Sequence, residues 1–258
     1  MRQNDNSSSL NSILNITAVS YLNTIPFLYG IEHSTLMKDF SLMIEFPANC
    51  AKLLMEGKAQ VGLVPVGGLS ELSGFNIISD YCIGAIGKVN SVSLYSKVPL
   101  EEIHQIHLDN ESLTSVKLVK VLANQYWKIH PKWISIHSTT GMHSFDYESV
   151  VLIGDKTFGQ EKKFTYVYDL AEQWMSYTHL PFVFAAWVAQ EGVSKTQIEE
   201  LNNALKWGVE RIEEAVEYYP IKVEKAFAIE YLKKYINYPL DDLKKDGLKL
   251  FIEKLSSI

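Results

Sequence analysis

The chain has 258 residues, of which 47% are hydrophobic and 21% charged, and its formal net charge is −6. This length allows one large domain or two compact ones, each with a packed core. The negative charge and the lack of a Lys/Arg run argue against a nucleic-acid partner, and no apolar stretch is long enough to cross a membrane. Any anionic ligand must therefore be held by local donors.

The first residues are polar and rich in Ser and Asn, which predicts a disordered tail over residues 1–14. No basic segment precedes an apolar one as in a secretory signal peptide, so we expect a cytoplasmic location. Cys50 and Cys82 stand apart in apolar surroundings. They are predicted to be buried, reduced thiols rather than a metal or redox pair.

Strand-like and helix-like segments alternate from residue 16 onward. Strands are predicted at Ile16–Ser20, Ser41–Phe46 and Gln60–Val64. A short helix should follow Thr24, and a second should span Pro47–Glu56 with the proline in its first turn and Gly57 after its end. This βαβαβ order predicts a parallel sheet with helices on its faces.

The alternation is interrupted over residues 75–96 and starts again after Pro99. The later strands are expected at His104–Leu108, Trp133–His137, Ser149–Ile153 and Phe182–Val188, and helices at Ser115–Trp127 and Asp169–Tyr177. Three helices should follow, the first opened by a capping box at Ser194–Gln197 and the second beginning near Pro220. The third should start near Asp241, with an apolar face made of Leu243, Leu248, Phe251, Ile252 and Leu255.

Two α/β segments followed by a helical tail predict an α/β fold with two lobes. If the tail packs back on the first lobe, the chain crosses twice, near Ser93–Val98 and near Leu180–Ala185. We therefore assign residues 15–95 and 185–258 to the first lobe and residues 96–184 to the second. A ligand is expected in the groove between the lobes, at the carboxyl ends of the strands.

Two predicted strands run directly into polar turns that open helices, at Ser20–Pro26 and at Leu108–Ser115. A helix start offers unpaired N–H groups and the positive end of a dipole. The Asn, Thr and Ser side chains of these turns add neutral donors. Two such starts facing each other would bind a small anion with more than one carboxylate.

The seven histidines show no metal-binding pattern. His104 and His107 are three apart on a predicted strand, so they face opposite sides. His137 and His143 straddle a loop with no Cys or paired carboxylates nearby. We therefore expect no metal site.

An ordered set of motifs runs along the chain: Val19–Pro26, Val61–Val66, Cys82–Gly87, Ser91-Val92, Leu108–Ser115, Ile153–Asp155 and Leu180–Ala185. In this combination the chain resembles the chorismate dehydratases, which open the futalosine route to menaquinone. The resemblance covers about residues 16–215. It implies the type II periplasmic-binding-protein fold, in agreement with the two predicted lobes, and a cytoplasmic enzyme.

The resemblance also implies a carbon–oxygen lyase (hydro-lyase) that converts chorismate to 3-[(1-carboxyvinyl)oxy]benzoate and water. The ring carbon bearing the enolpyruvyl ether loses a proton, the charge delocalises into the ring carboxylate, and the neighbouring hydroxyl leaves. Because the ring becomes aromatic, neither a metal nor a redox cofactor is expected. The enzyme must hold both carboxylates and help the hydroxyl to depart.

Our candidate catalytic residues are Asn23, Ser91 and Asp155. Asn23 donates to the substrate from its turn, or else it only caps the helix. Ser91 reaches the groove from the start of a strand, or else its hydroxyl bonds to backbone. Asp155 orients the substrate hydroxyl or acts as a base, or else it caps the next short helix. If Asp155 does not reach the proton, the enolpyruvyl carboxylate of the substrate takes it.

The substrate-binding candidates are Ser20, Tyr21, Ser112, Thr114, Ser115 and Gly154. The three hydroxyl residues after Leu108 form the predicted second carboxylate cradle. One of them must cap the helix, so two are expected to touch the ligand. Gly154 would let the backbone approach the ligand closely.

Three positions depart from the pattern of the resembled family. Gln60 stands where an acidic residue is usual, Leu113 where Arg is frequent, and His179 where Gly is usual. We interpret Gln60 as structural, whereas Leu113 removes a possible cation beside the anion site. The main alternative function is a non-catalytic binding protein or sensor for a small carboxylate on the same scaffold. A further alternative is the related enzyme that makes dihydroxynaphthoate, although the Ser20–Pro26 and Leu108–Ser115 motifs fit the dehydratase better.

Overall fold

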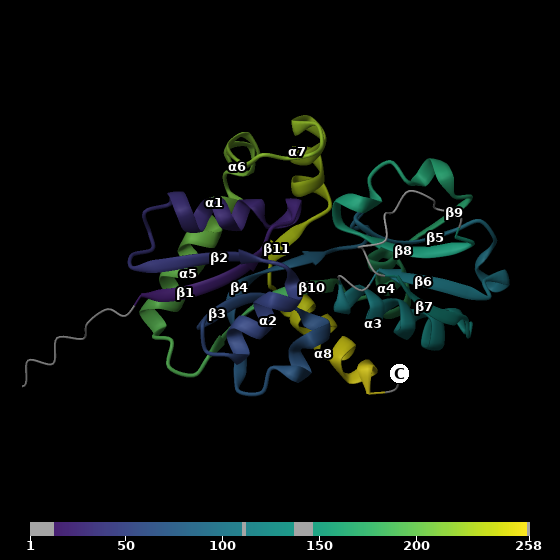
Figure 1. Cartoon of the computed structure of the whole chain (residues 1–258), viewed down its shortest axis with the longest axis horizontal. Helices are drawn as coiled ribbons and strands as arrows, with labels where there is room; N and C mark the ends of the chain where they lie inside the picture. The colour runs from purple at the N-terminus through teal and green to yellow at the C-terminus, as the bar shows by residue number, and fades with distance from the viewer. Residues whose placement is uncertain (1–12, 110–111, 137–146, 257–258) are drawn as a thin grey trace, which may run out of the picture.

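A computed structural model of the chain describes residues 13–109, 112–136 and 147–256. Within these residues, two β-sheets lie side by side along the long axis of the molecule (Figure 1). Residues 1–12 of the predicted tail lie outside the described residues. Leu14, which was predicted to belong to the tail, already begins the first strand.

The first sheet has six strands. Their order is β11 (Asn237–Pro239), β4 (Phe75–Ala85), β10 (Phe182–Gln190), β3 (Val61–Pro65), β1 (Leu14–Val19) and β2 (Phe40–Glu45). Strands β1, β2 and β3 pair in parallel, as the βαβαβ pattern predicts. Strand β10 comes from much later in the chain and pairs antiparallel with both β3 and β4, so the complete sheet is mixed.

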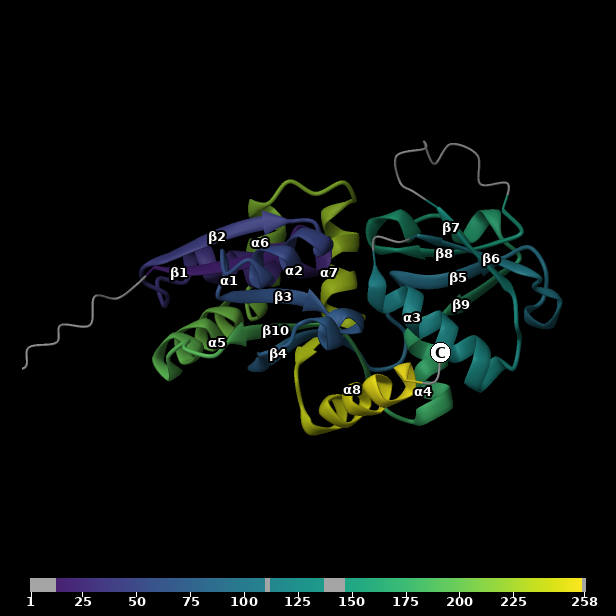
Figure 2. The same cartoon turned by 60° about the horizontal axis from the view of Figure 1, so that its bottom comes forward.

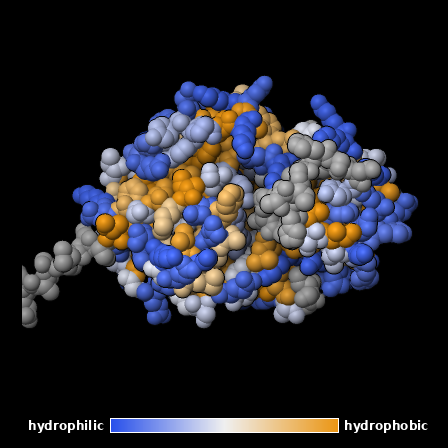
Figure 3. All heavy atoms as spheres, viewed as in Figure 1, coloured by the Kyte–Doolittle hydropathy of each residue, from blue (hydrophilic) through white to orange (hydrophobic). Residues whose placement is uncertain are grey.

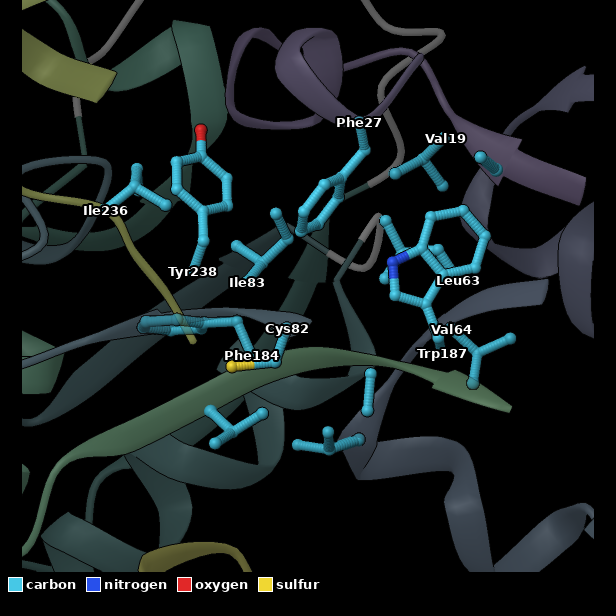
Figure 4. Packing of buried hydrophobic residues seen from close by; sticks show 14 of the residues in the cluster. Val19, Phe27, Leu63, Val64, Cys82, Ile83, Phe184, Trp187, Ile236 and Tyr238 are labelled. Carbon is cyan, nitrogen blue, oxygen red and sulfur yellow. The ribbon is translucent and has the colours of Figure 1, made fainter. Parts of the chain in front are cut away.

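Helices α1 (Ile25–His33) and α2 (Pro47–Met55) follow β1 and β2, and the 3-10 turns η1 (Leu22–Thr24) and η2 (Val66–Glu71) follow β1 and β3. Phe27 of α1 packs against Trp187 and Tyr238, with ring centroids 5.8 and 5.1 Å away (Figure 4). Burying one large apolar side chain contributes roughly 1.5–3 kcal/mol. The Tyr238 hydroxyl also donates to the Asn23 carbonyl at 3.0 Å. This core therefore anchors the turn that carries Asn23.

The second sheet has five strands. Their order is β7 (Lys132–Ile136), β6 (Gln105–Asp109), β8 (Ser149–Ile153), β5 (Val92–Ser96) and β9 (Tyr166–Asp169). Strand β6 is parallel to β7 and β8, whereas β5 is antiparallel to β8 and β9. Its helices are α3 (Leu113–Val121), prolonged by a π-helical turn η4 (Leu122–Trp127), and α4 (Leu170–Thr178). Three 3-10 turns complete this half: η3 (Leu100–Glu102), η5 (Gly154–Thr157) and η6 (Glu161–Lys163).

The strand pairing places the first crossing between the sheets earlier in the chain than predicted. Strand β4 ends in the first sheet at Ala85 and β5 begins in the second at Val92, so the chain crosses through residues 86–91. The predicted crossing at Ser93–Val98 is therefore wrong, because a strand's own residues do not specify which sheet it joins. The chain returns through residues 179–181, and Phe182 pairs with Ala85, so the two crossings lie side by side. We propose lobes of residues 14–85 with 182–256, and of 92–178.

In the fully described segment 191–256, four helices follow β10 instead of the predicted three. They are α5 (Lys195–Val209), α6 (Ile212–Tyr218), α7 (Lys225–Lys234) and α8 (Asp242–Leu255). The capping box at Ser194 and the start of α8 at Asp241 are confirmed. The predicted apolar face of α8 is partly wrong, because Leu243 and Ile252 are 59% and 39% exposed. Gly247 is buried instead. A Cβ at this position would lie 2.2 Å from the Pro181 carbonyl oxygen, so the backbone of α8 approaches Pro181 closely.

Helix α8 runs from the first sheet toward α3 and α4 of the other half (Figure 2). Near its end, Lys254 donates to Gln125 Oε1 and to the Tyr177 hydroxyl, both at 2.8 Å. The tail thus contacts both halves. Hydrophilic residues cover most of the face drawn in Figure 3, with apolar residues in smaller groups. No described helix combines the length and the apolar character needed to cross a membrane.

His179 ends α4 in the left-handed region, with φ +59°. This backbone conformation costs an L-residue about 1–2 kcal/mol, whereas glycine adopts it freely. We expect His179→Gly to raise the free energy of unfolding by about 0.5–1 kcal/mol, after the entropy lost by glycine is subtracted. Urea unfolding measures this change. The exposed, helical Ser176 supplies the control, because Ser176→Gly should lower stability by about 0.5 kcal/mol. A less stable His179→Gly variant would contradict the argument.

Candidate active site

A cavity of about 70 Å³ lies between the two sheets, where β1, β3 and β8 end. The first half contributes Val19, Tyr21, Asn23, Thr24, Pro47, Leu63, Pro65, Ile83, Phe184 and Ala185 to its lining. The first crossing and the second half contribute Val89, Ser91, Val92, Ser112, Ser115, Ile153 and Gly154. This is the expected place for a ligand in a two-lobed α/β protein.

Six of the nine predicted site residues line this cavity: Tyr21, Asn23, Ser91, Ser112, Ser115 and Gly154. Ser20, Thr114 and Asp155 do not. Among the described residues, the lining side chains carry no formal charge and combine a mainly apolar wall with hydroxyl and amide groups. An apolar wall with a few polar groups is the usual lining of a small-molecule site. The apolar wall also strengthens each hydrogen bond made inside it.

The start of α3 supplies one group of donors. Ser112 is the N-cap, and its Oγ accepts from the Ser115 N–H at 3.3 Å. The two Oγ atoms lie 2.9 Å apart. The expectation that one residue of this group caps the helix is therefore confirmed. Ser112 and Ser115 both line the cavity, so the start of α3 places hydroxyl groups where a carboxylate could bind.

Thr114 requires a correction, because the structure places it outside the cavity. Its buried hydroxyl donates to the Phe184 carbonyl and accepts from the Gly67 N–H, each at 3.0 Å. Both partners belong to the first half of the molecule. A Cβ at Gly67 would lie 2.8 Å from Thr114 Cα, so the two halves approach very closely here. Thr114 joins the halves instead of facing a ligand.

Asn23 lies in the turn η1, between β1 and α1. Neither η1 nor α1 has a side-chain cap, so Asn23 does not serve as one. Its Oδ1 accepts from Thr24 Oγ1 at 3.3 Å, which turns the amide nitrogen to the other side. Ser20 is a second correction, because it does not line this cavity. It lines an adjoining depression next to β2, which shares Val19, Tyr21 and Pro47 with the cavity.

Ser91 and Gly154 are held together by their backbones. Ser91 is fully buried, and its carbonyl accepts from the Gly154 N–H at 2.7 Å. Gly154 has φ +58°, and a Cβ there would stand 3.8 Å from the Tyr21 ring. Space alone would admit a side chain, so the left-handed backbone is the reason that glycine suits this turn.

Asp155 follows Gly154 but is not among the residues that line the cavity. Partial burial raises the pKa of its carboxyl, and Lys222 and the backbone N–H of Leu22 oppose that shift. The carboxylate therefore lies against the turn that carries Asn23, and its role as an orienting group or base stays a prediction.

Sequence reasoning missed Asp169 as a support of the site. Its buried carboxylate accepts from the Val89 N–H at 3.0 Å and from the Asn90 N–H at 2.7 Å. It also caps α4 through the N–H groups of Ala171 and Glu172. An Asp before a helix indicates the cap, but nothing local indicates the contact with the first crossing. Asp169 thus fixes the segment that ends at Ser91.

Tyr231 of α7 was also missed. Its hydroxyl donates to Ser91 Oγ at 2.7 Å, behind the cavity wall. The spacing of Phe227 and Tyr231 indicates one helix face, which predicts burial but no particular partner.

The structural interpretation of Gln60 is confirmed, since its Oε1 accepts from the Asn15 N–H at 2.9 Å. His137 and His143 lie outside the described residues. Within the described ranges, no group of three or more His, Cys, Asp or Glu is placed to hold a metal.

Two sheets joined by adjacent crossings, with a cavity between them, define a periplasmic-binding-protein-like fold. A crystal structure from Archaeoglobus fulgidus matches with a TM-score of 0.77 at 14% identity, covering 95% of this chain and 97% of that one. The periplasmic aliphatic sulphonate binding protein of Escherichia coli matches with a TM-score of 0.56 at 13% identity, covering 94% and 92%. These likenesses establish the fold.

The chain belongs to the menaquinone biosynthesis family, whose sequence model matches residues 14–257. A curated relative, the chorismate dehydratase of Thermus thermophilus, is 28% identical over 263 residues. The similarity covers 91% of this chain and 92% of that protein.

Proposed function

We propose that this protein is a chorismate dehydratase, a carbon–oxygen lyase that converts chorismate to 3-[(1-carboxyvinyl)oxy]benzoate and water. The observation that carries the proposal is the convergence of Asn23, Ser91, Ser112 and Ser115 on one cavity between the sheets. Membership of the menaquinone biosynthesis family and the similarity to the Thermus thermophilus enzyme support it.

The arrangement of donors suits a substrate with two carboxylates. We assign one carboxylate to the start of α3, where Ser112 and Ser115 stand. Asn23, in the turn after β1, and Ser91, at the end of the first crossing, hold the other polar groups, including the departing hydroxyl. Neutral donors in an apolar cavity stabilise the charge that grows on the ring carboxylate as the proton leaves. The apolar wall receives the ring.

The base is best supplied by the substrate. Because no described residue that lines the cavity carries a carboxylate, we assign the role of base to the enolpyruvyl carboxylate of chorismate. This carboxylate and the carbon that loses the proton belong to the same molecule. The proton transfer is therefore intramolecular, which removes the entropy cost of bringing two reactants together. An analogue without this carboxylate should bind but fail to react. Normal turnover of the bound analogue would rule the internal base out.

We also propose a cytoplasmic location. Cys50 and Cys82 are both free and buried. Unpaired cysteines of this kind are typical of reducing compartments.

The direct test is incubation of the purified protein with chorismate, followed by mass spectrometry. We expect loss of water from chorismate and accumulation of the aromatic enol ether, at a rate proportional to protein concentration. Calorimetric titration with chorismate is run on the same sample. Binding without any product would contradict the dehydratase and favour a binding protein on the same scaffold.

A further inference from the structure

Tyr231 does not line the cavity, but its hydroxyl bonds to Ser91, which does. We propose that Tyr231 is a positioning residue, which fixes the Ser91 hydroxyl as a hydrogen-bond donor toward an acceptor oxygen of the bound substrate. This inference rests on the proposed function and deepens it, because it assigns a direction to the hydrogen bond that Ser91 offers.

The Tyr231 ring is held firmly by both halves of the molecule. It is 2% exposed. Phe158 of the second half packs edge-on at a centroid distance of 5.4 Å, and Phe227 of α7 stacks at 6.5 Å. The hydroxyl therefore has one well-defined position, 2.7 Å from Ser91 Oγ.

The direction of the hydrogen bond follows from the contact between the two hydroxyls. The Tyr231 hydroxyl donates to Ser91 Oγ at 2.7 Å, so Ser91 Oγ is the acceptor in this bond. In the part of the chain that the structure describes, the Ser91 proton has no protein acceptor. Since Ser91 lines the cavity, its O–H points to the ligand.

The protonation of Tyr231 keeps this direction constant. Burial raises the pKa of Tyr231 far above its ordinary value, the charges of Asp155 and Asp169 raise it further, and the bonds to Ser91 and Asn23 oppose the shift. The phenol therefore keeps its proton throughout the range in which enzymes are assayed. Linked hydrogen bonds also polarise one another, which strengthens the last donor in the series. The site thus favours a carboxylate or hydroxyl oxygen next to Ser91.

The test combines two substitutions, Tyr231→Phe and Ser91→Ala, with the double variant. Tyr231→Phe keeps the packed ring and removes only the hydroxyl. We expect kcat/KM for chorismate to fall about 10-fold, the size expected for a hydrogen bond to a charged group. In the Ser91→Ala background the same change should have almost no further effect, because the two residues act in series. Equal losses in both backgrounds would indicate a merely structural role and overturn the proposal.

Tyr95→Phe is the matched control. Tyr95 is a buried tyrosine whose hydroxyl donates to the Thr157 carbonyl, away from Ser91. Its removal should leave kcat/KM within about twofold, as expected for a change outside the site.

A second measurement does not depend on turnover. In protein labelled with ¹³C-tyrosine, the buried Tyr231 hydroxyl proton should give a slowly exchanging NMR signal. In Ser91→Ala this signal should shift and exchange faster, and an unchanged signal would overturn the proposal. If the wild-type protein fails to convert chorismate, the proposed function fails, and this signal still decides whether Tyr231 donates to Ser91.

Discussion

Asn23→Ala should lower kcat/KM for chorismate by about 100–1,000-fold, the loss typical of removing one donor that stabilises developing charge. Asn23 lines the cavity, and its Oδ1 accepts from Thr24 Oγ1, which leaves the amide nitrogen as a donor. The substitution therefore removes a donor at the cavity. Initial rates of product formation, measured by mass spectrometry over a range of chorismate concentrations, give kcat and KM separately.

The control for Asn23→Ala is Asn203→Ala, at an exposed position of α5. It removes the same side chain without touching the cavity, so its kcat/KM should equal that of the wild type. The fold of Asn23→Ala should persist, because Tyr238 binds the backbone carbonyl of residue 23 and not its side chain. A rise in KM alone would assign Asn23 to binding, whereas a fall in kcat assigns it to the transition state. Wild-type values of both constants would remove Asn23 from the site.

Gly208→Ala should destabilise the protein by about 3 kcal/mol, at the upper end of the cost of overpacking. Helices α1 and α5 cross at Gly30 and Gly208, and a Cβ at position 208 would stand 1.9 Å from the Pro26 carbonyl oxygen. Helix propensity alone predicts the opposite sign, a gain of about 1 kcal/mol. The cost of the clash should exceed the gain in helix propensity, because backbone atoms cannot move aside as the end of a side chain can.

Thermal unfolding distinguishes these two signs. We expect Tm to fall by roughly 6–12 °C for Gly208→Ala, given about 2–4 °C per kcal/mol in a chain of this size. Asn203→Ala, on the exposed face of the same helix, should change Tm by less than about 2 °C. A Tm for Gly208→Ala above that of the wild type would show that the helices can separate at no cost.

The elements that sequence predicts well are those with local signals. The capping box at Ser194, the cap at Asp241 and the proline that opens α2 each act within one turn of a helix. The parallel pairing of β1, β2 and β3 follows from the short βαβ connections. The two strand-to-helix turns likewise predict Asn23, Ser112 and Ser115, because their chemistry is visible in adjacent residues.

The features that escape prediction depend on partners far along the chain. Thr114 bonds to Gly67 and Phe184, which are 47 and 70 residues away, so the motif could not show that its hydroxyl is already occupied. Tyr231 and Ser91 are separated by 140 residues. Strand β5 joins the second sheet only because β8 and β9 pair with it. The sequence of a short β-rich segment does not indicate which strands will pair with it.

The pairing of Ala85 with Phe182 places the two connections between the sheets side by side. A further tie between the halves is made by the backbone of Gly67, whose N–H donates to Thr114 Oγ1 at 3.0 Å and whose carbonyl accepts from Lys117 Nζ at 2.6 Å. Both bonds fall on the first turns of the helix that presents Ser112 and Ser115. The position of these two serines therefore depends on the opposite half of the molecule as well as on their own helix.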